Sequence, residues 1–107
     1  MNIITNDDLK CPFAITALKQ VDDPEIGLNV VDLGLIYHIE FDEEKKMVRC
    51  RMTLTTQFCP MGESIIAGIT NALQSVFEEY EIDVFLTFDP PWSHDMISEE
   101  GREFLNG

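Results

Sequence analysis

Hydrophobic and polar residues alternate along residues 47–55, where every second side chain is apolar. A period of two is typical of a strand that buries one face. Residues 35–41 alternate in a similar way, and the charged stretch 42–46 joins the two segments as in a hairpin. We therefore predict two antiparallel strands. The side chains expected on their buried faces are Leu35, Tyr37, Ile39 and Phe41 in the first strand and Val48, Cys50, Met52 and Leu54 in the second.

Two other segments have apolar residues at the spacing of a helix. From Pro60 to about Tyr80, apolar residues recur every three to four positions, which predicts the longer helix. A second helix is predicted over about Pro12 to Gln20, because proline is tolerated in the first turn. Residues 82–88 predict a third strand. After it, Ser93 is placed to cap a short C-terminal helix, in which Gly101 is a weak point.

The predicted order is helix, strand, strand, helix, strand and short helix. This order indicates an α+β fold, a two-layer sandwich in which a small mixed three-stranded sheet has the two longer helices packed on one face. The second and third strands are expected to be parallel, because a helix connects them. We expect a single domain over residues 1–107, with residues 1–5 as a loose tail.

Charge and composition narrow the possible functions. The 107 residues include 20 acidic and 7 basic ones, a formal net charge of −13. Nucleic acid and anionic membranes are disfavoured as partners, since phosphate contacts need clustered Lys and Arg. The acidity either keeps the chain soluble or attracts a basic partner. No segment resembles a signal peptide or a membrane span, and three cysteines do not make a disulfide framework. We therefore expect a cytoplasmic protein.

Cys59 has the most specific chemical setting in the chain. It lies where the predicted strand ends and the longer helix begins, directly before Pro60. A helix N-terminus exposes unpaired N–H groups and the positive end of the dipole, and both favour a thiolate. The alternative is that Cys59 is a small buried hydrophobe. Cys50 is expected to be buried in its strand, and Cys11 is expected to have no special role.

Three acidic residues, Asp23, Glu25 and Asp32, surround a glycine-containing loop before the first strand. They either form turns and local caps, or they bring Asp32 toward Cys59 as an acid beside a thiol or as an oxygen ligand. Trp92, which follows two prolines, is either a lid on the core or the roof of a pocket near Cys59. No pair of Cys or His residues has the spacing of a zinc site, so a closed zinc site within one chain is not expected.

Four segments in this order resemble one family of proteins, the metal–sulfur cluster biosynthesis proteins that include SufT and the PaaD-like subunits. The resemblance covers nearly the whole chain. One position differs from the family pattern: Phe58 stands where many members are expected to have a glycine. The four segments are Asp23–Ile26, Val31–Tyr37, Met52–Pro60 and Asp89–Ser93.

The resemblance implies a small α+β domain that acts in the maturation of iron–sulfur proteins and is not an enzyme. It also implies that Cys59, within a Thr-x-x-Cys-Pro motif, is the functional cysteine and metal ligand, and that Glu25 and Asp32 shape its surroundings. The protein would be a carrier or adaptor that delivers a transient iron–sulfur cluster or iron from the assembly machinery to client apoproteins. One thiolate does not complete the four ligands of a cluster, so we expect a homodimer, a partner protein or a small thiol to supply the rest.

Two other functions remain open from the sequence. PaaD-like relatives imply an accessory subunit of an aromatic-ring (phenylacetyl-CoA) epoxidase system. A thiol-dependent redox protein is disfavoured, because no resolving cysteine lies near Cys59.

Overall fold

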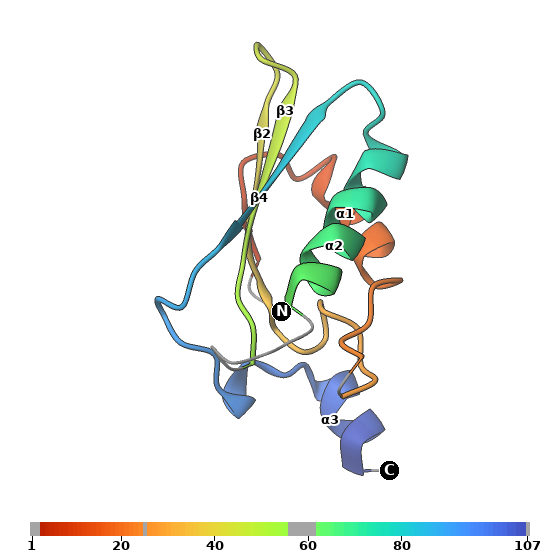
Figure 1. The fold of residues 1–107 in the computed structure, drawn as a ribbon, viewed down its shortest axis with the longest axis vertical. Helices are drawn as coiled ribbons and strands as arrows, with labels where there is room; N and C mark the ends of the chain where they lie inside the picture. Colours follow the sequence, from red (N-terminus) through yellow and green to blue (C-terminus); the bar gives the residue numbers. More distant parts are fainter. Residues whose placement is uncertain (1–2, 25, 56–61, 107) are drawn as a thin grey trace.

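The computed structural model describes residues 3–24, 26–55 and 62–106, and it confirms the α+β class. Figure 1 shows α1 and α2 together on one side of the sheet, with α3 at one end of the molecule beside the C-terminus. In chain order, the elements are β1 (Ile4–Thr5), α1 (Cys11–Leu18), β2 (Ile36–Asp42), β3 (Met47–Met52), α2 (Gly62–Val76), β4 (Glu81–Leu86), the 3-10 helix η1 (His94–Met96) and α3 (Glu99–Asn106).

The sheet has the order β1-β2-β3-β4, one strand more than the sequence predicted. As predicted, β2 and β3 are antiparallel, and β4 is parallel to β3. The additional strand is β1, which pairs parallel to β2 through Ile4 and Thr5, in contrast to the loose tail expected there. Asn6 holds this edge, because its side-chain amide donates to the Phe41 carbonyl and its Oδ1 accepts from the Phe41 N–H, both at 2.9 Å.

Strand β2 departs from the predicted alternation at Tyr37. The pairing steps from Ile36 opposite Met52 to His38 opposite Arg51, so Tyr37 is the extra residue of a β-bulge. Because of this bulge, Ile36 is the buried side chain and Tyr37 is only half-buried, contrary to the prediction. The bulge therefore changes which residues of β2 face each side of the sheet.

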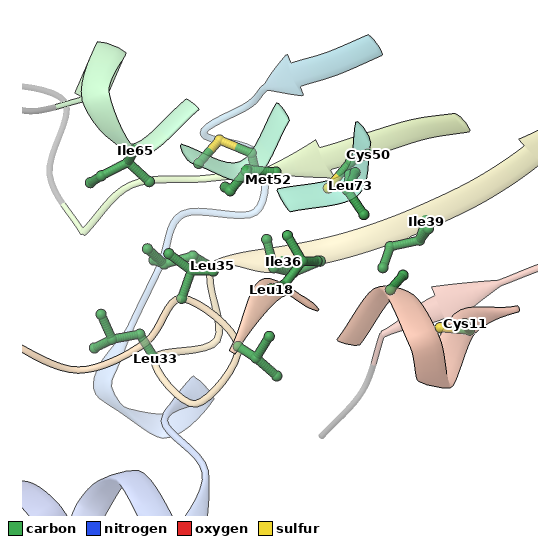
Figure 2. Close-up of a cluster of buried hydrophobic side chains, with 14 of the residues drawn as sticks. Cys11, Leu18, Leu33, Leu35, Ile36, Ile39, Cys50, Met52, Ile65 and Leu73 are labelled. Atoms are coloured by element: carbon green, nitrogen blue, oxygen red, sulfur yellow. The ribbon is translucent and has the colours of Figure 1, made fainter. Parts of the chain in front are cut away.

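The core lies between the sheet and the two helices on its covered face. The predicted inward residues of β3, which are Val48, Cys50 and Met52, are all buried. Figure 2 shows Cys50 and Met52 in one cluster with Leu73 of α2 and, nearby, Leu18 of α1. Helix α2 ends at Val76, earlier than the predicted Tyr80.

The C-terminal helix is divided in two, where the sequence predicted one. Ser93 precedes η1, and the extended backbone of Ile97 separates η1 from α3. Ser98 caps α3, because its Oγ accepts a hydrogen bond of 3.0 Å from the Gly101 N–H. Gly101 is buried, and a Cβ on it would lie 2.9 Å from Cγ2 of Ile97, so this glycine provides close packing instead of the weak point predicted.

Candidate functional site

The loop between α1 and β2 has its own hydrogen-bonded structure. Asp22 and Asn29 form an isolated β-bridge across it. The backbone carbonyl of Asp23 accepts a hydrogen bond of 2.7 Å from the N–H of Gly27, whose φ of +83° closes the turn. Asp23 itself is buried, with only 1% of its surface exposed. These contacts therefore fix the positions of Asp23 and Gly27.

The Asp32 carboxylate accepts a hydrogen bond on each oxygen. Nδ2 of Asn29 donates to Oδ2 at 2.6 Å, and Oγ of Ser98 donates to Oδ1 at 2.8 Å. The Ser98 N–H also donates to the Asp32 backbone carbonyl at 2.7 Å. Asp32 is buried, and its two side-chain partners come from the loop and from the residue that caps α3. These contacts connect the loop to the C-terminal segment.

A second set of contacts holds the turn at Leu33 and Gly34. Nε1 of Trp92 donates to the Leu33 carbonyl at 2.6 Å, and Trp92 packs against the core, the first of the two roles predicted for it. Gly34 has a φ of +80°, and a Cβ on it would lie 2.3 Å from the backbone oxygen of Met96. The segment after β4 therefore packs directly on the Asp-Leu-Gly turn.

Sequence reasoning did not predict Asn29 or Ser98 as members of this arrangement. Asn29 could have been recognised from the sequence, because an Asn side chain often accepts a hydrogen bond from the backbone N–H three residues later. Here Oδ1 of Asn29 accepts from the Asp32 N–H at 2.9 Å. Ser98 is 66 positions from Asp32, and no spacing along the chain relates them. The fold alone brings these two residues together.

Cys11 and Cys50 are core residues. Burial raises the pKa of the Cys50 thiol to about 12, and Cys50 has no exposed surface, which confirms its predicted burial. Burial also raises the pKa of Cys11, which is 5% exposed at the start of α1. Both therefore stay neutral near pH 7, whereas metal binding requires the thiolate.

The other two predicted site residues, Cys59 and Glu25, lie outside the described residues, so the approach of Asp32 to Cys59 stays a prediction. Within the described ranges, no three His, Cys, Asp or Glu side chains gather closely enough to hold a metal ion. The same part of the chain contains no helix long and apolar enough to cross a membrane.

This architecture is that of a class of small α+β domains with solved members. A crystal structure of the domain of unknown function DUF59 from Bacillus anthracis superposes with a TM-score of 0.83, at 32% identity, over 91% of each chain. The sequence specifies the family, because residues 14–84 match the model of the iron–sulfur cluster assembly protein family. The chain belongs to this family, which confirms the resemblance predicted from its four motifs.

Curated relatives agree with this assignment. The Fe-S protein maturation auxiliary factor SufT of Staphylococcus aureus (strain USA300) is 40% identical over 82 residues, 77% of this chain and 92% of that protein. The factor of the same description from Bacillus subtilis (strain 168), YitW, is 38% identical over 86 residues, 80% of this chain and 83% of that protein.

A weaker match concerns the alternative function. A relative in Escherichia coli (strain K12), named as a putative component of 1,2-phenylacetyl-CoA epoxidase, is 32% identical over 89 residues. The alignment covers 82% of this chain but only 52% of that protein.

Proposed function

We propose that this protein is an auxiliary factor in the maturation of iron–sulfur proteins. It carries an iron–sulfur cluster or iron as cargo between the cytoplasmic assembly machinery and client apoproteins, and it catalyses no turnover of metabolites. Support comes from its membership of the iron–sulfur cluster assembly protein family and from two relatives, 38% and 40% identical, that are named as maturation auxiliary factors.

The role of Cys59 is supported by the burial of the other two cysteines. Cys11 and Cys50 are buried, and burial raises the pKa of both thiols, so neither supplies a thiolate near neutral pH. Thiolate ligation by this chain therefore falls to Cys59, which stands in the Thr-x-x-Cys-Pro motif. We assign Cys59 as the ligand of the cargo.

One cysteine per chain requires ligands from outside the chain. Iron–sulfur clusters are held by four ligands, most often cysteine thiolates. Among the described residues, no three His, Cys, Asp or Glu side chains lie close enough together to hold a metal ion. A homodimer that brings two Cys59 side chains together, completed by a partner or a small thiol, meets this need. In this proposal, Glu25 and Asp32 shape the surroundings of Cys59. Asp32 does so by connecting its loop to Ser98 through a hydrogen bond.

Transfer of cargo is the direct test of this function. The chain is loaded anaerobically with radioactive iron and sulfide, freed of excess iron, and mixed with an apo-ferredoxin. We expect label to move to the ferredoxin faster than from a solution of free iron and sulfide. Transfer no faster than from that solution would contradict a carrier role.

The second candidate, an accessory subunit of an epoxidase, is supported by the similarity to the E. coli protein. Anaerobic affinity purification of native partners distinguishes the two. Cluster-assembly proteins and varied iron–sulfur apoproteins support the general factor, whereas oxygenase components alone support the dedicated one.

A further inference from the structure

The outer edge of β4 pairs with no strand among the described residues, because the sheet order ends at β4. Two backbone hydrogen bonds show which residues of this part of the chain face β3. The Glu81 N–H donates to the Lys46 carbonyl at 2.8 Å, and the Thr87 N–H donates to the Met52 carbonyl at 2.9 Å. The register between these two bonds is continuous, and backbone groups alternate between the two sides of a strand.

Three residues of β4 therefore direct their N–H and C=O groups to the open edge. They are the alternate residues between Glu81 and Thr87, namely Ile82, Val84 and Leu86. A row of such backbone groups at a sheet edge is a template for one more strand.

The side chains of the same three residues leave the apolar layer incomplete at this edge. They share a face with their partners on β3, the face that α1 and α2 cover (Figure 1). Those partners have no exposed surface, whereas Ile82 and Val84 are half-buried and Leu86 is 43% exposed. The helices thus cover β3 completely and β4 only in part. A further strand would bury the remaining apolar surface if its side chains on this face were apolar.

Charge in this part of the chain has one sign. Residues 62–86, which form α2, β4 and the connection between them, contain no lysine or arginine. The acidic residues of this segment are Glu63, Glu78, Glu79, Glu81 and Asp83. Charge complementarity therefore favours a basic partner at the edge of β4.

Glu81 is the acidic residue of β4 that is most open to such a partner. On the face of the sheet away from the helices, Asp83 lies beside Arg49, which offsets its charge. Glu81 lies beside Met47 and is exposed. None of the ion pairs within 4.0 Å among the described residues includes Glu81.

We propose that the outer edge of β4 binds an extended segment of a partner protein in which apolar residues alternate with lysine or arginine. The segment adds one strand to the sheet. Since successive side chains of a strand point to opposite faces, its apolar residues pack beside Val84 and Leu86, and its basic residues lie on the other face beside Glu81. A second copy of this chain is a poorer occupant of this edge, because it would bring the same acidic residues to it.

Fluorescence anisotropy with labelled peptides tests this proposal on the protein without iron, so its outcome is separate from that of the cargo-transfer test. The probe is a peptide of about ten residues that alternates lysine with valine. The matched peptide has the same composition, with the lysines and the valines in two separate blocks. At about 0.15 M salt, where long-range attraction is screened, we expect saturable binding of the alternating peptide and none of the block peptide.

N-methylated peptides show whether a strand is added. Only every second N–H of an added strand points to β4. N-methylation of one alternate set of residues in the probe should therefore abolish binding, and N-methylation of the other set should leave it unchanged.

Glu81→Gln should weaken binding of the alternating peptide about fivefold, the size expected for one solvent-accessible ion pair. The matched control is Glu40→Gln, which removes the same charge from the same face but on β2, two strands from the edge, and should change binding little. Far-UV circular dichroism and melting temperatures of both variants verify that they fold.

Four results would overturn the proposal: equal binding of the two peptides, binding of neither, equal effects of the two N-methylated sets, or equal losses in the two variants. Self-association in sedimentation velocity that the alternating peptide abolishes would also overturn it, because a second copy would then occupy the edge.

Discussion

Asp32 and Ser98 are joined by a hydrogen bond of 2.8 Å from the serine hydroxyl to the carboxylate, although 66 positions separate them in the chain. The same hydroxyl accepts from the Gly101 N–H and so caps α3. Ser98 therefore holds the start of α3 and the loop of the candidate site at once. The positions of these two parts of the molecule depend on each other.

Ser98→Ala is expected to lower the free energy of unfolding by about 1–3 kcal/mol, since it removes a helix cap and leaves a buried carboxylate oxygen short of a donor. Urea unfolding followed by circular dichroism measures the loss. Ser98→Thr is the matched control, because it keeps the hydroxyl and should lose less. Equal stability of the alanine variant, the threonine variant and the wild type would contradict the link.

A double-mutant cycle isolates the contact between the two side chains. Asp32→Ala, Ser98→Ala and the double variant are compared by urea unfolding. We expect a coupling energy of about 0.5–3 kcal/mol, the range found for residues in one hydrogen-bond network. Simple additivity of the two single losses would show that the contact contributes nothing to stability.

Gly34→Ala is expected to destabilise the protein far more than Gly27→Ala. Both glycines have positive φ, +80° and +83°, so an alanine is strained at either position, by about 1–2 kcal/mol. Only at Gly34 would the new Cβ also meet other atoms, 2.3 Å from the Met96 oxygen, whereas nothing lies within 4 Å at Gly27. The difference in unfolding free energy between the two variants measures the cost of the contact between the new Cβ and Met96. A difference near zero would contradict this close packing.

Local patterns predicted the layers of the fold. The alternation at Val48, Cys50 and Met52 and the helical spacing at Ile65, Ile69 and Leu73 identified the two faces that meet in the core. These patterns are visible because each one repeats within a single element.

Features that depend on distant pairing could not be predicted in this way. Strand β1 has only two residues, too few to show a period, and it exists through its pairing with β2. The bulge at Tyr37 follows from the register with β3, not from the sequence of β2 alone. The link between Asp32 and Ser98 likewise needs the complete fold.

Thiol titration should distinguish the three cysteines. In the native protein at about pH 8, a disulfide reagent such as dithiobis(nitrobenzoate) is expected to modify one thiol quickly, assigned to Cys59, because burial protects Cys11 and Cys50. In denaturant, all three should react. Native Cys59→Ser should show no fast reaction. A fast phase that persists in this variant would place the accessible thiol elsewhere.

Stability is expected to fall between pH 9 and 12 in part because of Cys50. Its pKa is raised from 9.0 to about 12 in the folded chain, so the unfolded chain releases this proton first as the pH rises. Over that window the unfolded state binds fewer protons than the folded state, and the free energy of unfolding decreases; below pH 9 this group has no effect. Urea unfolding under reducing conditions should give a flatter pH dependence for Cys50→Ala. Parallel curves for variant and wild type would contradict the shift.

The central claim is that Cys59 ligates the cargo, and Mössbauer spectroscopy after anaerobic reconstitution with ⁵⁷Fe and sulfide tests it most directly. Wild type and the control Cys11→Ala, which removes a buried neutral thiol, should both show the spectrum of a bound cluster, whereas Cys59→Ser should show none. A Cys59→Ser protein that takes up the same cluster in the same amount would contradict the account.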